Sequence, residues 1–420
     1  MINVLGIILL IVFLLGFRQP ILLVLIALTA YVHVFWGDRK LSYLIDDMWT
    51  ALSHEALLAI PMFILAGSLM SRGSIAQRLI AIMRSLTVWM PGGMAVAAIA
   101  SCAIFASISG ASTVTLLAVG AVMYPALLKN GYTEKFALGA LAAGGTLGIL
   151  IPPSIPMIFY AIVVEKSIVD MFLAGLLPGL LLASVMAVYA LIVNRHIPAQ
   201  RFELGACVAA LRNGFWALML PVVLLGGIYS GYFSATESAA VAVGYALVVE
   251  IFIHRELSLR DFGDLSRETG VLLGTLFPIV AAAISLNMLL TAERVPQELA
   301  AIVAAHVEGR IAFLLMVNIL LLIVGCFVDT MSAIVILAPL LLPMAESYGI
   351  DPIHFGIIMV INLEIGLLTP PMGLNLIVAM TAFKANFGTV IRGALPFIAL
   401  MLVVLMIITF VPEISLALIN

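Results

Sequence analysis

Two short polar stretches lie inside apolar sequence, where oxygen atoms can bind an ion or a small solute. Residues 107–113 read Ser-Ile-Ser-Gly-Ala-Ser-Thr, and residues 325–331 read Gly-Cys-Phe-Val-Asp-Thr-Met. Small hydroxyl residues also mediate ordinary packing between membrane helices. Their position beside two helix breaks favours contacts with an ion and a substrate over packing alone.

The two helix breaks are the proline doublets Pro152-Pro153 and Pro370-Pro371. A proline inside a helix removes a backbone hydrogen bond and clashes with the preceding turn. In hydrocarbon the freed carbonyls need partners, so such breaks lie inside protein or beside a polar cavity. We expect unwound segments at 145–153 and 363–371. Carbonyls exposed there suit a sodium ion, and half-helix N-termini suit an anionic group.

The polar stretches and the doublets belong to an internal repeat. The doublets are 218 residues apart (370 − 152), and the polar stretches keep the same offset (325 − 107). Two merely kinked helices would not require a shared offset, whereas two copies of one proline-broken unit are typical of secondary transporters. Further pairs at this offset are Pro125 and Pro343, Gly131 and Gly349, Lys166 and Lys384, Gly175 and Gly393, and Pro178 and Pro396.

The composition requires a membrane environment for the whole chain. Hydrophobic residues make up 64% and charged residues 10%, whereas a soluble domain is about half apolar and a quarter charged. The fold class predicted is therefore an all-α polytopic membrane protein. No basic tract or glycine-rich phosphate loop points to nucleic acid or nucleotide, and no catalytic constellation points to an enzyme. The three cysteines lack paired spacing.

The apolar pattern divides the chain into four parts. They are an N-terminal scaffold helix (1–50), repeat one (51–193), inter-repeat scaffold helices with basic loops (194–268) and repeat two (269–420). Each repeat has one order of elements: a crossing, an interfacial amphipathic helix, a hairpin, a proline-broken crossing and a final crossing. In repeat one these elements are expected at 51–71, 74–89, 93–128, 136–164 and 169–193; repeat two has the amphipathic helix at 294–307 and the hairpin at 311–345.

The region between the repeats sets the expected orientation. Two crossings, at 214–230 and 236–253, separate a polar loop at 194–212 from a basic loop at 254–267. The positive-inside rule places both loops in the cytoplasm. Three crossings plus a re-entrant hairpin in each repeat give an odd count, which inverts repeat two in the membrane. Loops at equivalent positions of the two repeats carry different charges, as expected if repeat two is inverted.

Three acidic residues lie within apolar segments: Glu237, Asp329 and Glu364. An ionisable residue there is a functional hypothesis by default, because its burial is costly. Asp329 either faces a polar cavity or stabilises backbone amides at the hairpin tip, and Glu364 is positioned to orient the second break. For Glu237 a structural role at the start of a helix near residue 236 is favoured.

Residues 351–375 closely resemble the large membrane subunit, of DctM type, of tripartite ATP-independent periplasmic (TRAP) transporters. The motif is Asp-Pro-Ile-His-Phe-Gly at 351–356, followed by Asn-Leu-Glu-Ile-Gly-Leu-Leu-Thr-Pro-Pro-Met-Gly-Leu-Asn at 362–375. Residues 107–112 and 151–156 are similar to the first-half motifs of that family. The resemblance covers essentially the full chain and departs at Ala111, where many members carry serine.

The resemblance implies a sodium-driven secondary transporter of the bacterial inner membrane. It implies an inverted-repeat, elevator-type fold with two re-entrant hairpins and two proline-broken helices. The expected partners are a small four-helix membrane subunit (DctQ type), a periplasmic solute-binding protein (DctP type) and membrane lipid. The expected substrate is a small organic anion such as a C4-dicarboxylate or a sugar acid. Na+ is the coupling ion with no other cofactor, and no fused small subunit is expected.

The resemblance also implies where the ligands bind. One sodium site would lie between the hairpin at 107–113 and the break at 145–149, and the other between 325–332 and 366–369. The residues expected at the sodium sites are Ser107, Gly110, Ser112, Gly145, Gly148, Gly325, Asp329, Thr330, Gly366 and Thr369, many through their backbone carbonyls. Those expected at the substrate are Ser109, Ser112, Thr330 and Asn375.

Other classes of function make different predictions. A divalent-anion/sodium symporter would share the repeats but take up its solute without a binding protein. A channel would need a continuous ring of polar residues lining a pore, which the sequence does not show. An intramembrane enzyme would need a catalytic set and measurable hydrolytic activity.

Overall fold

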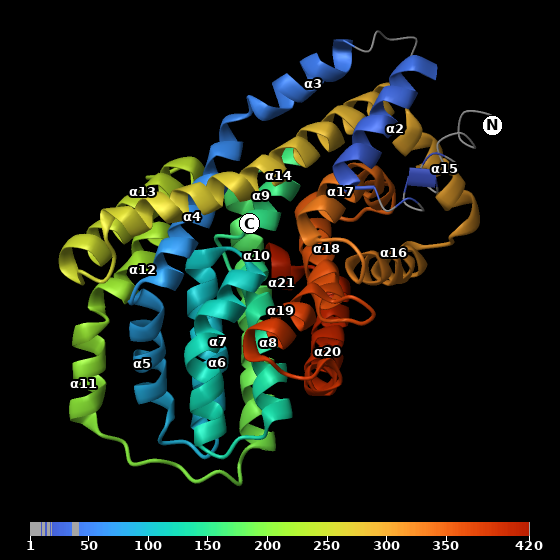
Figure 1. The fold of residues 1–420 in the computed structure, drawn as a ribbon. Helices are drawn as coiled ribbons and strands as arrows, with labels where there is room; N and C mark the ends of the chain where they lie inside the picture. Colours follow the sequence, from blue (N-terminus) through green and yellow to red (C-terminus); the bar gives the residue numbers. More distant parts are fainter. Residues whose placement is uncertain (1–9, 11–12, 15–16, 18, 36–41, 420) are drawn as a thin grey trace.

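The computed structural model describes the chain except residues 1–9, 11–12, 15–16, 18, 36–41 and 420. The described part is helical, with no strand (Figure 1). Eight helices in it are long and apolar enough to cross a membrane, or up to ten if each of two bent helix pairs counts as one span. The prediction of an all-α polytopic membrane protein is confirmed.

The five central helices of each repeat correspond along the chain. In repeat one they are α6 (Gly93–Ser109), α7 (Ser112–Lys129), α8 (Glu134–Leu150), α9 (Ile155–Val163) and α10 (Ile168–Val193). In repeat two they are α16 (Arg310–Gly325), α17 (Thr330–Ser347), α18 (Pro352–Leu367), α19 (Leu374–Phe383) and α20 (Phe387–Phe410). Both ends of α7 match α17 at the offset of 218 (112 + 218 = 330; 129 + 218 = 347).

The two repeats interlock reciprocally. Helix α7 of hairpin one packs on α19, and α17 of hairpin two packs on α9. In the same way α8 packs on α20, and α18 packs on α10. Such exchanged contacts are those of two copies related by an approximate two-fold axis. Each hairpin therefore touches the broken helices of both repeats, which brings the two polar stretches into one central region.

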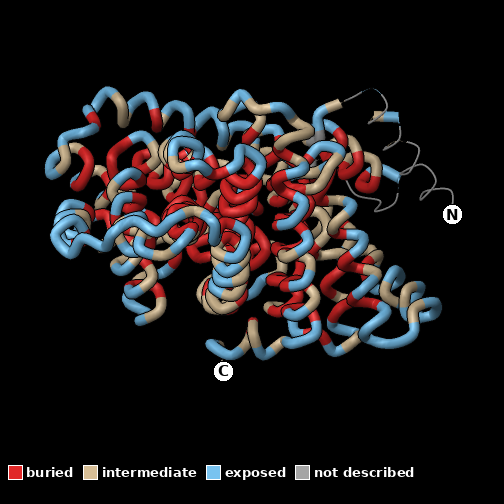
Figure 2. The backbone as a smooth tube through the Cα atoms, turned by 90° about the horizontal axis from the view of Figure 1, so that it is seen from below, coloured by how far each residue is buried: buried red, intermediate tan, exposed pale blue. Residues whose placement is uncertain are grey.

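The broken helix of repeat one is the most enclosed segment. Nearly every residue of α8 and α9 is buried, and Figure 2 shows the buried backbone gathered in the middle of the molecule. Helix α10 exposes much of its surface by contrast. A helix that is apolar all round and buried all round is positioned by protein contacts rather than by lipid. The fold thus encloses the first break on every side.

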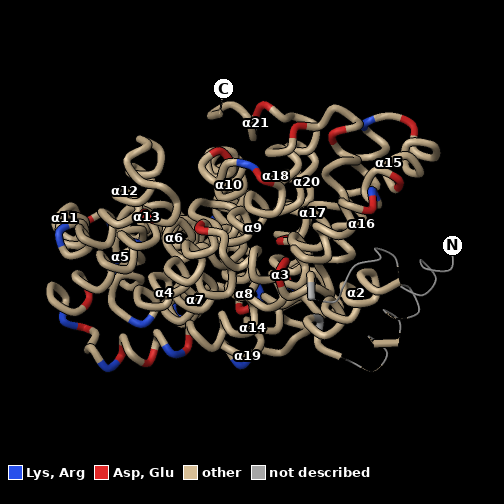
Figure 3. Tube along the Cα trace, turned by 90° about the horizontal axis from the view of Figure 1, so that it is seen from above, with Lys and Arg blue, Asp and Glu red and all other residues tan. Residues whose placement is uncertain are grey.

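The remaining helices surround the two repeats. They are α2 (Ile21–Phe35), α3 (Ser42–Leu52), the short 3-10 helix Glu55–Leu58, α4 (Ala59–Arg72), α5 (Ile75–Thr87), α11 (Leu204–Asn213), α12 (Phe215–Tyr229), α13 (Ala235–Leu247) with the π-helix Val248–Ile253, α14 (Leu259–Ala292), α15 (Val295–His306) and α21 (Glu413–Leu416). Helix α14 runs diagonally across the molecule and packs on α2, α3 and α4 (Figure 1). Charged residues lie mainly at the periphery, including the start of α14 (Figure 3).

Several boundaries differ from the sequence prediction. Helices α8 and α18 continue to Leu150 and Leu367, so the expected unwound segments at 145–153 and 363–371 shrink to 151–154 and 368–373. A proline disturbs only the turn that precedes it. The polar loop at 194–212 contains α11, and α14 begins at Leu259 within the expected basic loop. The described part of residues 1–50 includes α2 and most of α3, which ends at Leu52.

The interpretation of Glu237 as a helix-capping residue is confirmed. Its Oε2 accepts a hydrogen bond from the Ser234 backbone N–H at 2.8 Å, and its own backbone N–H donates to the Ser234 hydroxyl at 3.2 Å. These reciprocal bonds form a capping box at the start of α13. Glu237 therefore starts a helix.

Candidate functional site

The tip of hairpin one lies directly on the first helix break. Helix α6 ends at Ser109, and Gly110 takes the left-handed conformation with φ +61°. The Gly110 carbonyl accepts a hydrogen bond from the Ile155 backbone N–H at 3.2 Å. A Cβ at Gly110 would lie 2.8 Å from the Pro153 carbonyl oxygen. Both the backbone angle and the close approach therefore require glycine here.

The predicted glycines of α8 hold the hairpin against the helix. A Cβ at Gly148 would lie 2.7 Å from both the Ala111 carbonyl oxygen and the Thr115 hydroxyl. A Cβ at Gly145 would lie 3.1 Å from the Ser112 carbonyl oxygen. These positions lie in regular helix, so their role here is close backbone approach. The predicted Ser107 donates its hydroxyl to the Ile104 carbonyl at 2.7 Å within its own helix.

Oxygen atoms gather around the Ala111 carbonyl. It accepts from the Thr115 backbone N–H at 3.2 Å, the Thr115 hydroxyl at 3.0 Å and the Ser109 hydroxyl at 3.4 Å. The two hydroxyls are 2.7 Å apart. Sequence reasoning missed Thr115, whose only signal is its place one helical turn after Ala111 in an uncharged segment. The hydroxyls of Ser109 and Thr115 and the Ala111 carbonyl thus satisfy one another.

A side-chain contact joins the two repeats at the centre. The Asn375 amide nitrogen of α19 donates to the Ser112 hydroxyl of α7 at 2.5 Å, and both residues are buried. Ser112 and Asn375 were both predicted as substrate residues on different repeats. The structure brings these two together, while the predicted Ser109 bonds to Thr115 and Thr330 lies at the other hairpin tip.

Helix N-termini converge on this centre. Helix α7 begins at Ser112 and α19 begins next to Asn375, while the start of α9 bonds to the tip of hairpin one. Each N-terminus carries a partial positive charge. Their convergence beside a hydroxyl and an amide is suited to the carboxylate of an anionic solute.

We call the junction of the hairpin-one tip with the first break half-site one, and the junction of the hairpin-two tip with the second break half-site two. Half-site two repeats the backbone contact of half-site one with a longer hairpin tip. A Cβ at Gly325 would lie 3.0 Å from the Leu363 carbonyl oxygen, and one at Gly366 would lie 2.8 Å from the Gly325 carbonyl oxygen. The tip spans residues 326–329, and a cavity of about 140 Å³ separates it from the second break. The cavity is lined by residues 325–329, Leu367, Met372, Leu374 and Ile377.

Asp329 caps helix α17. Its Oδ2 accepts a hydrogen bond from the Ser332 backbone N–H at 3.0 Å. Of the two roles open from the sequence, stabilisation of backbone amides is therefore the one observed, and the residue also borders the cavity. The predicted Thr369 donates its hydroxyl to the Ile365 carbonyl at 2.7 Å.

Buried acceptors without a hydrogen-bond partner accumulate in repeat two. Among the described residues they include Thr330 Oγ1, Asn362 Oδ1, Asn375 Oδ1 and both carboxylate oxygens of Glu364. The Asn362 amide nitrogen donates to Asn318 Oδ1 at 2.6 Å, a link between α18 and α16 that sequence reasoning missed. Leaving buried acceptors unpaired is costly. Hard oxygen donors of this kind fit a sodium ion.

The fold and site together define a multi-pass membrane transporter built on two interlocked repeats. The family model described as "Tripartite ATP-independent periplasmic transporter, DctM component" matches residues 7–414. This chain therefore belongs to the large-permease family of TRAP transporters. Family membership implies solute uptake that depends on a binding protein, with DctQ-type and DctP-type proteins as partners.

Named relatives agree with this assignment, and a solved structure shares the fold. The C4-dicarboxylate TRAP transporter large permease protein DctM of Pseudomonas aeruginosa is 44% identical over 370 residues, 87% of each chain. The ectoine/5-hydroxyectoine large permease UehC of Ruegeria pomeroyi is 34% identical and covers 96% of this chain and 95% of its own. The YdaH transporter of Alcanivorax borkumensis has a similar fold, with TM-score 0.65, 14% identity and coverage of 94% and 97%.

Proposed function

We propose that the chain carries out sodium-coupled uptake of a small organic anion, delivered by a periplasmic binding protein, across a bacterial inner membrane. The observation that carries the proposal is the junction of Ser112 and Asn375, where residues of both repeats meet among converging helix N-termini. A carboxylate bound there would accept hydrogen bonds from a hydroxyl, an amide and backbone N–H groups.

A C4-dicarboxylate is the proposed substrate. The similarity to a C4-dicarboxylate permease supports it, and other relatives with substrates such as ectoine define the alternatives. The large permease would recognise the carboxylate group, while the binding protein would select the rest of the solute.

Sodium is proposed to bind at the two half-sites. In repeat one the Ala111 carbonyl and the hydroxyls of Ser109 and Thr115 supply oxygen atoms within 3.4 Å of one another. In repeat two the unpaired acceptors on Thr330 and Glu364 supply oxygen atoms. Sodium bound at either half-site would lower the free-energy cost of holding these oxygen atoms close together. It would therefore favour the arrangement in which the hairpin tip is packed against the helix break.

An elevator movement is the proposed mechanism. The two hairpins and the two broken helices are packed on one another as one body, which would move against α4, α13 and α14. Because the site lies inside this body, the solute would cross the membrane with it. The interlocked contacts of α7 with α19 and of α17 with α9 support movement as a unit.

The test is uptake by purified components in proteoliposomes. The permease, the small subunit and the binding protein loaded with labelled succinate should transport only with an inward sodium gradient. Transport by the permease alone would support a symporter that works without a binding protein. Equal transport in sodium and in potassium would contradict sodium coupling.

A further inference from the structure

Glu250 clamps the corner between α4 and α5. This residue lies in the π-helix that follows α13, and its carboxylate is fully buried. Oε1 accepts a hydrogen bond from the Ile75 backbone N–H at 2.8 Å, and Oε2 accepts from the Ser74 hydroxyl at 3.3 Å. The carboxylate therefore caps the N-terminus of α5 from a different helix, where a negative charge is favourable.

The clamp extends through a closed network. The Ser74 hydroxyl accepts from Arg78 Nε at 3.0 Å and lies 3.1 Å from His254 Nδ1. His254 Nδ1 is 3.8 Å from Glu250 Oε2, and Arg78 Nη1 donates to the Asn213 carbonyl at 3.0 Å. Helices α5 and α11 and the π-helix after α13 are thus joined around one buried carboxylate. Removing one partner from such a network is strongly destabilising.

Gly73 shows how closely the corner is packed. A Cβ at this residue would overlap the Glu250 carboxylate, with Oε2 at 2.7 Å. Gly73 has no left-handed backbone angle, since its φ is −81°. The glycine is therefore required by the carboxylate and not by the chain conformation.

The equivalent corner in repeat two lacks a clamp. Helix α14 ends at Ala292, and α15 begins at Val295 after Glu293 and Arg294. Arg294 has φ +59°, and no described side chain caps the start of α15. The two amphipathic helices are thus attached differently: α5 is fixed by a buried charge, whereas α15 is not.

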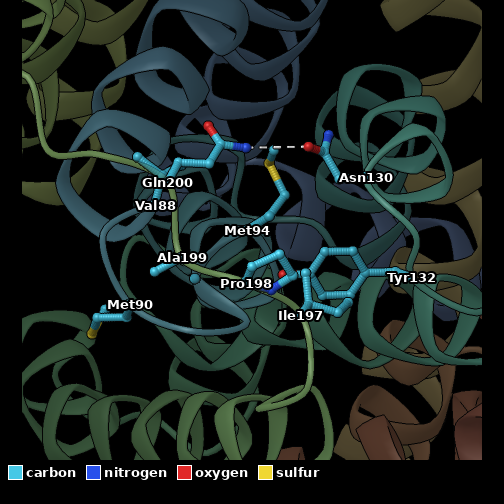
Figure 4. A pocket seen from close by; sticks show the side chains of 10 residues that line it. Val88, Met90, Met94, Asn130, Tyr132, Ile197, Pro198, Ala199 and Gln200 are labelled. Atoms are coloured by element: carbon cyan, nitrogen blue, oxygen red, sulfur yellow. Dashed lines mark hydrogen bonds between the residues drawn. The ribbon is translucent and has the colours of Figure 1, made fainter.

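The far end of α5 offers room for movement. Gly92, with φ +72°, links α5 to α6, and a cavity of about 160 Å³ lies beside this link (Figure 4). The segment 194–200 follows the same end: the Gly92 N–H donates to the Ile197 carbonyl at 3.2 Å, and the Gln200 side chain donates to Asn130 Oδ1 at 3.2 Å. This segment is therefore tied to the base of hairpin one.

We propose that Glu250 fixes the first amphipathic helix to the scaffold, so that repeat one flexes at residues 88–93 while repeat two flexes at residues 293–294. Glu250 is then a positioning residue for transport. The proposal rests on the elevator movement proposed above. The two repeats would then have different hinges. The hinge of repeat one follows its amphipathic helix α5, and the hinge of repeat two precedes its amphipathic helix α15.

The contact itself is tested by a double-mutant cycle. G73A and E250A should each raise hydrogen exchange at the amides of residues 75–78, and G73A should have no further effect in an E250A background. Each single variant should lower the maximal uptake rate roughly tenfold, the equivalent of about 1.4 kcal/mol, with half-saturation by loaded binding protein unchanged. G244A, whose Cβ would meet open space, is the matched control. Additive effects of G73A and E250A would overturn the clamp.

The hinge position is tested by spin-label distances in the full transporter in nanodiscs, with and without sodium and loaded binding protein. The distance between exposed positions Ala81 and Ala240, across the clamp, should stay constant. The distance from Ala81 to exposed Leu117 of hairpin one should shift. A shift across the clamp of the same size would overturn the hinge assignment alone. Constancy of both distances would contradict the elevator movement on which it rests.

Discussion

The two half-sites share a backbone plan and differ in chemistry. In both, a hairpin tip meets a broken helix through glycines that allow backbone contact, Gly148 in repeat one and Gly366 in repeat two. The oxygen atoms of half-site one bond to one another, whereas half-site two keeps unpaired acceptors and a cavity beside its tip. At the offset of 218, Glu364 stands where repeat one has Thr146 (364 − 218). The duplication thus preserved the close contacts and let the polar groups diverge.

The shared plan predicts equal damage from filling either glycine contact. G148A and G366A force the hairpin away from the broken helix, and overpacking of about 1–3 kcal/mol corresponds to roughly tenfold to hundredfold slower uptake. G226A on α12 is the matched control, because its Cβ would meet open space. Initial rates in proteoliposomes measure the effect. Full activity of G148A would show that the contact of hairpin one with the broken helix is not part of the functional site.

Because the polar groups of the two half-sites differ, substitutions of Glu364 and of the equivalent Thr146 should have unequal effects on sodium dependence. E364Q should raise the sodium concentration for half-maximal uptake roughly tenfold, because one of two unpaired buried carboxyl oxygens is replaced by an amide nitrogen, which cannot bind a cation. T146V should leave it unchanged, since the Thr146 hydroxyl already donates to the Ala143 carbonyl at 2.6 Å. The measurement is uptake against sodium concentration for both variants. Equal shifts would show that the half-sites do not differ in this respect.

The contact between the repeats predicts coupled effects of S112A and N375A. Each should lower sodium-dependent uptake several-fold without preventing membrane insertion, because the remaining partner is left unpaired in the core. The double variant should be no worse than the more damaging single one. Binding of succinate-loaded binding protein provides the control for assembly. If the losses of uptake in the two single variants multiply in the double variant, Ser112 and Asn375 act independently and the proposed coupling is wrong.

The smallest effects are expected at the two cap positions. Asp329 caps α17, while Ala111 holds the same position before α7 without a capping side chain (329 − 218 = 111). D329A should lower stability by about 1 kcal/mol, and D329N should retain most of it because asparagine also caps. A111S should stabilise the protein slightly. Thermal unfolding in detergent measures the stability of all three variants. Loss of uptake in a stable D329N variant would instead assign Asp329 an ionic role.

Backbone signals in the sequence predicted the architecture well. Proline doublets, glycines and the common offset indicated the repeats, hairpins and breaks, because these residues act on the chain locally and keep their spacing. The extent of unwinding was wrong, since close packing stabilises helix at Gly145 and Gly148 almost up to the prolines. The capping role of Glu237 was predictable because both partners lie within one helical turn.

Tertiary contacts of the candidate site were harder to predict. The pairs Asn318–Asn362 and Ser112–Asn375 join residues 44 and 263 positions apart, and no local pattern marks them. The contact of Glu250 with Ile75 also depends on how the π-helix after α13 lies beside the start of α5. The resemblance to TRAP transporters, which covers essentially the full chain, implied the predicted site positions, yet only the packing shows which of their atoms already have partners.

Both half-sites are proposed to couple sodium to uptake of a solute delivered by a binding protein. The most direct measurement is uptake of labelled succinate by the reconstituted three-component system, with sodium or potassium gradients of equal size. Sodium coupling at both half-sites predicts accumulation only with the sodium gradient and all three components, and a higher sodium requirement in E364Q. Equal accumulation in potassium, or accumulation by the permease alone, would contradict it.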